Sequence, residues 1–248
     1  MPAPGEVNQE IGKAYLHVFI AALENNIAGF ENKFTVYTEP EKTAFKGRSG
    51  KSFSFDFSGF YDHPIKARQV FGESKGYTKG ATLLSEFREF LAKSYVVSTD
   101  YQHNRDDFFW FVTNVPFGCT EGSGIRSFQF IKEALTDKTN KQVQEIVGEG
   151  HVDDDVVRSL VTRLGVFILT DSFLMNTELS YKVARGDTLW SIFRKFHGGI
   201  PPGFGTKSRL IAEKNSLPSP DEIRSGDKIK LRWYGLRSGT ADEDIALY

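Results

Sequence analysis

The sequence predicts a mixed α/β (α+β) fold followed by a small second module. Segments with helical spacing of apolar residues alternate with segments of strand spacing over the first two thirds of the chain. Of the 248 residues, 40% are hydrophobic and 22 are phenylalanine, which is enough for a core and excludes a disordered chain. Residues 181–233 hold 11 Lys/Arg against 5 Asp/Glu, whereas residues 137–180 hold 4 against 8. Such segregation of charge indicates separate structural units.

Periodicity predicts the elements of the first unit one by one. In the second strand, Phe53, Phe55 and Phe57 alternate with polar residues, so we expect the three rings to share one face. The apolar run near residue 110 is typical of a central strand covered on both faces. The predicted elements are a helix over 9–30, strands over 33–40, 51–61 and 67–77, a helix over 82–96, a strand over 107–118, helices over 124–137, 141–147 and 153–164, and a strand over 165–174.

Three consecutive aspartates, Asp153, Asp154 and Asp155, stand at the start of one predicted helix. Such a triplet could bind a metal ion. Capping is the favoured interpretation, because carboxylates stabilise the N-terminus of a helix.

The third predicted strand contains two charged residues, Glu73 and Lys75, within an otherwise apolar stretch. Residues two apart on a strand point to the same face, so these side chains should lie together. Asp56 is on the polar face of the preceding strand, 17 residues earlier. If the two strands are neighbours, two carboxylates and one ammonium group converge within a few ångströms.

That set of groups suits metal-assisted hydrolysis of a phosphodiester. Two carboxylates supply the hard oxygen ligands that Mg²⁺ prefers. The ion polarises the phosphoryl oxygen and lowers the pKa of a bound water molecule. Lys75 would orient or help to deprotonate the attacking water and offset charge in the transition state.

Asp56 followed by Glu73-Ser74-Lys75 resembles the motif of the PD-(D/E)XK nucleases, although Phe55 stands where that motif has proline. The expected order α-β-β-β-α-β over residues 9–118 is similar to the core of that superfamily. The resemblance implies a restriction-endonuclease-like mixed sheet flanked by helices, with Asp56, Glu73 and the main-chain carbonyl of Ser74 holding Mg²⁺ or Mn²⁺ and Lys75 as the catalytic lysine. It also implies a further glutamate ligand from the first helix, for which Glu24 and Glu31 are the candidates.

The C-terminal module resembles a LysM domain almost from end to end. The segments that carry the resemblance are "YKVARGDTLWSI" (181–192) and "IAEKNSLPSPDEIRSGDKIKL" (211–231). The expected fold is βααβ, with Asp187 as a helix N-cap, Trp190 and Ile192 in the core and a second helix over about 207–214. We therefore expect a nuclease-like domain over 1–178, a LysM domain over 179–234 and an acidic flexible tail over 235–248.

LysM domains characteristically bind glycans that contain N-acetylglucosamine, in a groove between two loops. The resemblance places that groove here at Gly186, Asp187, Thr188, Leu189, Asn215, Pro220, Asp221 and Ile223. The surplus of basic residues offers a second interpretation, in which the module grips a nucleic-acid backbone. A third is docking of a protein or a second copy of the chain.

The sequence therefore predicts a metal-dependent nuclease with DNA as the favoured substrate and a LysM accessory module. A regulatory protein partner or self-association is open, and restriction or antiphage defence in a prokaryote follows by analogy. The single cysteine, the absence of a basic leader and the shortness of every apolar run favour a cytoplasmic protein without a membrane span. The alternative is a glycan- or peptidoglycan-binding LysM protein whose nuclease-like domain is inactive.

Overall fold

The computed structural model describes residues 4–26, 34–61, 68–76, 82–101, 107–115, 117, 124–170, 174, 179–197 and 203–231. Within these residues the fold is a mixed α+β architecture with a small βααβ unit at its C-terminal end, as predicted. The expected tail over 235–248 lies outside the described residues.

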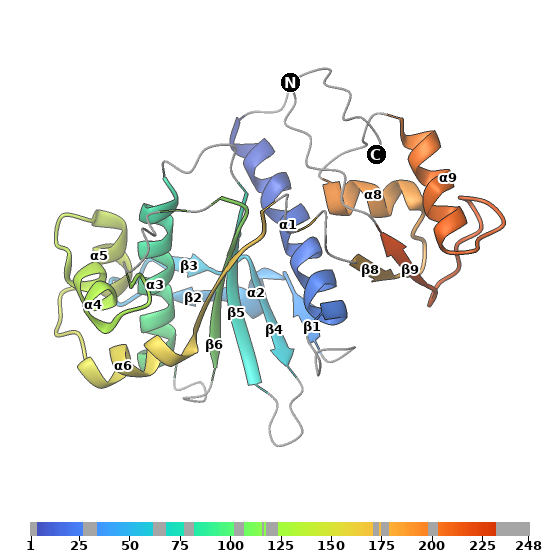
Figure 1. Cartoon of the computed structure of the whole chain (residues 1–248). Coiled ribbons are helices and arrows are strands. Elements are labelled where there is room, and N and C mark those ends of the chain that lie inside the picture. Colours follow the sequence, from blue (N-terminus) through green and yellow to red (C-terminus); the bar gives the residue numbers. More distant parts are fainter. Residues whose placement is uncertain are drawn as a thin grey trace.

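A five-stranded mixed sheet forms the centre of the first unit (Figure 1). Its strands are adjacent in the order β1-β4-β5-β6-β7. β4 is antiparallel to both neighbours, whereas β5, β6 and β7 are parallel to one another. The bounds are β1 Phe34–Tyr37, β4 Phe57–Tyr61, β5 Arg68–Lys75, β6 Phe108–Thr113 and β7 Leu164–Ile168.

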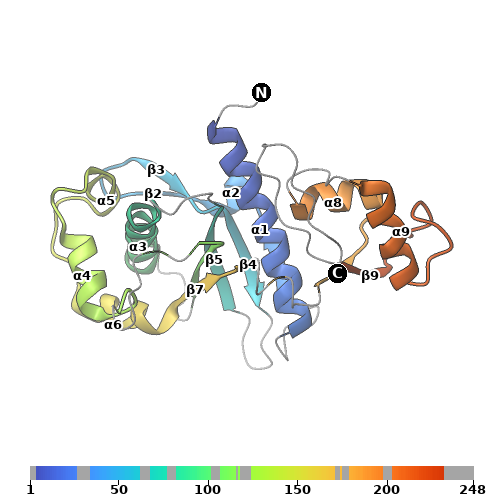
Figure 2. The same cartoon turned by 45° about the horizontal axis from the view of Figure 1, so that its top comes forward.

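Helices cover both faces of this sheet (Figures 1 and 2). α1 (Pro4–Asn26) lies on one face and α3 (Leu83–Asp100) on the other, each above its own hydrophobic cluster. α4 (Phe128–Thr136), α5 (Lys141–Val147) and α6 (Asp154–Arg163) pack around α3. α1 begins before the predicted residue 9 and ends before Gly29, which lies outside the described residues.

The single strand predicted over 51–61 is two strands. β3 (Ser52–Ser54) pairs with β2 (Ala44–Lys46) in a separate hairpin that follows the short helix α2 (Pro40–Thr43), and β4 enters the main sheet. Phe53 and Phe55 therefore pack in the cluster beneath α3, while Phe57 packs in the cluster beneath α1. The expectation that the three rings share a face is wrong, because the chain changes sheets at Asp56 and the alternation starts again.

The aspartate triplet caps a helix, as the sequence favoured. The Asp153 side chain accepts a hydrogen bond from the Asp155 backbone N–H at the start of α6. Asp154 pairs with Lys132 of α4 at 2.9 Å. These contacts give the triplet a structural role.

The C-terminal unit consists of β8 (Leu179–Lys182), α8 (Leu189–His197), α9 (Phe204–Lys214) and β9 (Lys228–Leu231). β8 and β9 pair antiparallel. Figure 2 shows α1 between the main sheet and this unit, and α1 contacts both α8 and β8. Because α1 has apolar partners on two sides, its buried residues surround the helix: Tyr15, Leu16, Val18, Phe19, Ala21 and Leu23 belong to one cluster that also contains Ile192, Phe193 and Phe196 of α8.

Candidate functional site

The charged residues of β5 lie beyond the point where β4 stops pairing with it. β4 begins at Phe57, opposite Gly72 of β5, so Asp56 lies beside the last residues of β5. The Asp56 Oδ2 atom accepts a hydrogen bond of 2.9 Å from the Ser74 backbone N–H, which has no β4 partner at this position. The strand break after β3 thus places a carboxylate where the ladder would otherwise continue.

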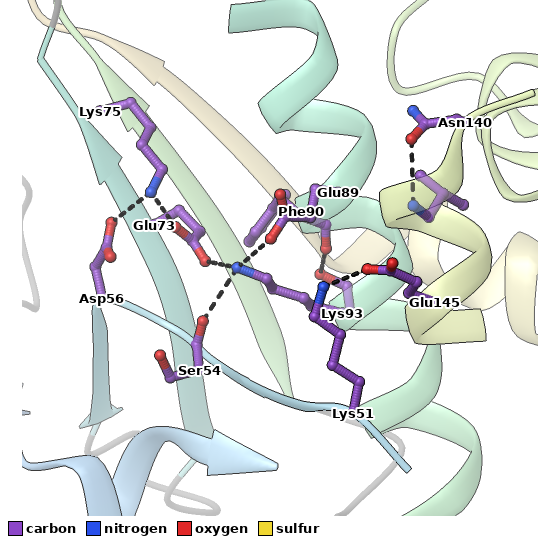
Figure 3. Close-up of polar contacts among 12 residues, drawn as sticks. Lys51, Ser54, Asp56, Glu73, Lys75, Glu89, Phe90, Lys93, Asn140 and Glu145 are labelled. Atoms are coloured by element: carbon purple, nitrogen blue, oxygen red, sulfur yellow. Dashed lines mark hydrogen bonds and ion pairs between the residues drawn. The ribbon is translucent and has the colours of Figure 1, made fainter. Parts of the chain in front are cut away.

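The structure brings Asp56, Glu73 and Lys75 together (Figure 3). The Lys75 Nζ atom is 3.1 Å from Asp56 Oδ2 and 2.5 Å from Glu73 Oε2. Because both oxygens contact one nitrogen, they are no further apart than the sum of those distances, 5.6 Å. Lys75 and Asp56 are partly exposed, with 24% and 41% of their side chains accessible, whereas Glu73 is buried.

The two carboxylates differ in the oxygens that they leave available. Both contacts to Asp56 fall on Oδ2, and within the described residues Oδ1 accepts no hydrogen bond. Both oxygens of Glu73 contact lysines, Oε2 through Lys75 and Oε1 through Lys93. An incoming cation would therefore find an accessible oxygen on Asp56 and an already oriented carboxylate on Glu73.

The sequence reasoning missed a second lysine, Lys93 of α3. Its Nζ atom lies 2.8 Å from Glu73 Oε1, 3.0 Å from Glu89 Oε1 and 3.1 Å from the Ser54 carbonyl oxygen. These three acceptors match the three N–H donors of an ammonium group. A signal was present, because Lys93 stands three residues after buried Phe90 on the apolar side of an amphipathic helix.

Burial dominates the protonation of this cluster. Burial raises the pKa of Glu73 to about 7, the Asp56 carboxylate acts in the same direction, and Lys75 and Lys93 oppose them. Burial alone would lower the pKa of Lys75, but Glu73 and Asp56 outweigh it and hold that pKa above its ordinary value. The same balance, with Glu73 and Glu89 as the partners, raises the pKa of Lys93. Both lysines are therefore cations at neutral pH.

Two further carboxylates on α3 add negative charge. Glu89 contacts Lys93, and Glu86 interacts electrostatically with Lys75, Asp56 and Lys93. When ionised, the four carboxylates of Asp56, Glu73, Glu86 and Glu89 face only two ammonium groups. The excess of two negative charges is what one divalent cation would balance, and the oxygen ligands suit Mg²⁺ or Mn²⁺. Within the described part of the chain, no group of three or more His, Cys, Asp and Glu side chains is already arranged around a metal position.

The neighbouring backbone is held by α1. The Ser74 hydroxyl donates to the Gly12 carbonyl at 2.7 Å, and a Cβ atom at Gly12 would lie 2.6 Å from the Ser74 carbonyl oxygen. The small residue at position 74 thus admits a helix, whereas Gly72 admits the ring of Phe57, whose Cζ atom would be 2.1 Å from a Cβ. The role predicted for the Ser74 carbonyl as a metal ligand stays a prediction.

The assignment of Glu24 or Glu31 as an extra ligand stays a prediction. Glu24 is 12 residues after Gly12 in α1, which at 1.5 Å per residue places it roughly 18 Å further along the helix axis. The side chain of Glu24 lies outside the described part of α1. Glu31 lies outside the described residues.

In the C-terminal unit, the polar residues of the expected groove have structural partners. Asp187 accepts hydrogen bonds from the Tyr181 hydroxyl at 2.7 Å and the Ala184 N–H at 2.8 Å, and it pairs with Lys195. Asn215 joins α9 to β9 by accepting from the Lys230 N–H at 2.6 Å and donating to the Lys230 carbonyl at 2.9 Å.

Three expectations for this unit change. Thr188, not Asp187, caps α8, because the Thr188 hydroxyl accepts from the Ser191 N–H while the Ser191 hydroxyl accepts from the Thr188 N–H. Trp190 is exposed rather than in the core, with 48% of its surface accessible, and Arg194 lies over its ring. Leu189 is buried, so it is a core residue rather than part of a groove surface. Gly186 and Asp221 are exposed and Pro220 and Ile223 are half-buried, as a shallow groove would require.

Comparisons with known proteins bear mainly on the C-terminal unit. A solved structure of the Acinetobacter baumannii Cap4 SAVED/CARF-domain containing receptor, with the cyclic trinucleotide 2'3'3'-cAAA, is similar with 12% sequence identity and a TM-score of 0.33. The match covers 68% of this chain and 33% of that one, so the chain spans about a third of the receptor's length. No curated protein matches the chain. Within the described residues, no helix is both long and apolar enough to cross a membrane.

The family model of the LysM domain matches residues 181–232. This range contains the second half of β8 and all of α8, α9 and β9, and the βααβ order and antiparallel β8–β9 pair agree with the predicted module. The C-terminal unit is a LysM domain.

Proposed function

We propose that the first unit is a metal-dependent nuclease that hydrolyses phosphodiester bonds, with DNA as the favoured substrate. The observation that carries the proposal is the contact of Asp56 and Glu73 with one lysine, Lys75, at the end of β5. These residues stand in the order and spacing of the PD-(D/E)XK motif that the sequence resembles. The α-β-β-β-α-β succession of α1, β1, β4, β5, α3 and β6, interrupted by the α2–β2–β3 insertion, also supports it.

The residues would divide the work as follows. Mg²⁺ or Mn²⁺, when bound, supplies polarisation of the phosphoryl oxygen and a more acidic water molecule. Asp56, whose side chain is partly exposed, would offer its Oδ1 atom as a ligand, and Glu73 would offer a carboxylate that Lys75 and Lys93 already orient. Lys75 uses two of its three N–H groups on these carboxylates, which leaves one donor for the attacking water or a phosphoryl oxygen.

The protonation of Lys75 favours an electrostatic role. Its two carboxylate neighbours raise its pKa, so the ammonium form holds its proton in the metal-free site. A cation at this position offsets negative charge that develops on the phosphoryl group. Orientation of the water and charge stabilisation therefore fit Lys75 better than proton abstraction.

Plasmid cleavage tests the proposal. Wild-type protein with Mg²⁺ or Mn²⁺ should cleave, and Asp56→Ala and Lys75→Ala should each lose at least about 100-fold in rate. Lys51→Ala is a matched control, because Lys51 is an exposed lysine that pairs with Glu145 and not with a carboxylate of the cluster. Equal cleavage by Lys75→Ala and wild type would overturn the assignment.

A role in restriction or antiphage defence extends this proposal by analogy with small nucleases that carry accessory domains. Cells expressing wild type should plate phage less efficiently than cells expressing Lys75→Ala at equal protein levels. Equal plating across a panel of phages would count against defence while leaving the nuclease assignment to the cleavage assay.

The LysM match favours a second candidate function, glycan binding with an inactive first unit. Pull-down on peptidoglycan or chitin, together with no cleavage by wild type, would support this candidate. Cleavage that depends on Asp56 and Lys75 would exclude the inactive first unit.

A further inference from the structure

The β8–β9 pair of the LysM domain presents lysines on one face. Lys182 is directly opposite Lys228, and Lys230 follows two residues later on the same face. All three side chains are exposed. The other face, which includes Ile229 and Leu231, is buried in the hydrophobic cluster shared with α8.

Two arginines extend this charge beyond the end of the strands. The turns that follow β8 and precede β9 are joined, because the Val183 N–H donates to the Asp227 carbonyl and the Gly226 N–H donates to the Val183 carbonyl, each at 2.8 Å. Arg185 stands in the first turn and Arg224 in the second, and both are exposed. We call the set Lys182, Arg185, Arg224, Lys228 and Lys230 the basic face.

Two carboxylates close in sequence to the basic face have other partners. Asp187 pairs with Lys195 at 2.8 Å, and Asp227 Oδ2 accepts from the Arg224 backbone N–H at 2.8 Å. Among the described residues, Lys182, Arg185, Arg224 and Lys228 make no ion pair. These four side chains therefore carry positive charge that no ion pair offsets within the described part of the protein.

Such an arrangement costs stability. Directly opposed residues of an antiparallel pair have Cβ atoms about 5 Å apart, and like charges in that position repel each other. A neutral glycan would not relieve this repulsion. A chain of phosphates would, because each phosphate that contacts a lysine or arginine also releases a condensed counterion.

We propose that the basic face of the LysM domain binds the sugar–phosphate backbone of nucleic acid. The choice of nucleic acid among polyanions rests on the nuclease proposed for the first unit. In this role the LysM domain holds the substrate polymer without reading its sequence, since backbone contacts carry no base information.

Salt-dependent binding of a labelled DNA duplex tests the assignment in EDTA, where cleavage does not interfere. Each phosphate contact makes the slope of log K against log salt steeper by about 0.9. If the variant and wild type bind equally at 1 M salt, the loss of one contact therefore weakens binding about eightfold at 0.1 M salt. The double variant Lys182→Gln/Lys228→Gln should therefore bind about 60-fold more weakly than wild type. Lys182→Arg/Lys228→Arg should bind like wild type.

A control variant that also loses two positive charges shows whether DNA binding depends on the basic face or only on the net charge of the protein. Arg209→Gln/Lys214→Gln removes two exposed cations of α9, outside the basic face. This variant should bind within about twofold of wild type. Equal losses in both double variants, or no loss in Lys182→Gln/Lys228→Gln, would overturn the proposal.

Two further measurements separate DNA binding by the basic face from glycan binding and from the proposed nuclease activity. Binding to a chitin oligosaccharide or to an anionic cell-wall polymer but not to DNA would overturn the proposal. If wild type binds through the basic face but never cleaves with Mg²⁺ or Mn²⁺, the nuclease assignment fails and the binding site stands.

Discussion

The two units of this protein use buried polar side chains in different ways. In the LysM domain, Asp187 and Asn215 hydrogen-bond to backbone groups that the βααβ fold would otherwise leave unpaired. In the first unit, Glu73 and Lys93 are buried charges that pair with each other and with further charged side chains, Lys75 for Glu73 and Glu89 for Lys93. Burying such a pair is no more favourable than an apolar pair of the same size. The LysM polar residues thus serve the fold, whereas under the proposed function the charges around β5 serve chemistry.

The largest expected effect is on the free energy of unfolding of Lys93 variants, which tests whether the buried Glu73–Lys93 pair serves the fold. Lys93→Met leaves Glu73 buried with one lysine fewer, which should cost about 3 kcal/mol in the free energy of unfolding. The double variant Lys93→Met/Glu73→Met should recover most of that loss, because it removes both charges. Urea denaturation measures both values. If the double variant were as unstable as the single one, the pair would serve the fold and the contrast with the LysM domain would fail.

A glycine in α1 gives the next effect. Gly→Ala inside a helix normally stabilises it by up to about 1 kcal/mol. Gly12→Ala should instead destabilise by about 1–3 kcal/mol, because its Cβ would lie 2.6 Å from the Ser74 carbonyl oxygen. It should also reduce cleavage, since Ser74 donates to Asp56.

Gly205→Ala in α9 is the matched control, because a Cβ there meets no atom within 4 Å. Thermal unfolding of the two variants should shift in opposite directions. A Gly12→Ala protein with unchanged stability and cleavage would show that α1 does not hold the end of β5 at the candidate site.

A smaller effect is expected in the LysM domain. Asn215→Ala removes the side-chain bonds to the backbone of Lys230 and should cost about 1–2 kcal/mol. Cleavage by the first unit should not change at temperatures where the variant is folded. A loss of cleavage in folded Asn215→Ala would contradict the division between the two units.

The smallest effect is a pH dependence where α1 meets the LysM domain. His17 of α1 lies near Phe196 of α8, and burial, followed by the charge of Lys195, lowers the His17 pKa. The unfolded chain therefore binds more protons than the folded one below about pH 6.5, and stability falls as pH decreases through that range. Wild type should lose stability between pH 7 and pH 5 relative to His17→Phe. Parallel curves for the two proteins would show that His17 does not titrate in this contact.

Local patterns were sufficient for much of the fold and for three residues of the candidate site. α5 was predicted at its observed bounds, and the shared face of Glu73 and Lys75 followed from strand geometry. The break at Asp56 was not predictable from alternation, because Phe53, Phe55 and Phe57 keep a strand pattern while the chain changes sheets. Lys93 was missed for a related reason, since only the packing of α3 against β5 shows that a helix residue completes the cluster.

Anomalous diffraction from crystals grown with Mn²⁺ tests the central claim most directly, because it locates the ion without relying on turnover. We predict a manganese peak within about 2.2 Å of Asp56 Oδ1 and of one Glu73 oxygen, with no such peak in Asp56→Ala crystals. Full occupancy of Mn²⁺ elsewhere, with Lys75 still bridging Asp56 and Glu73, would contradict the assignment of this cluster as the metal site.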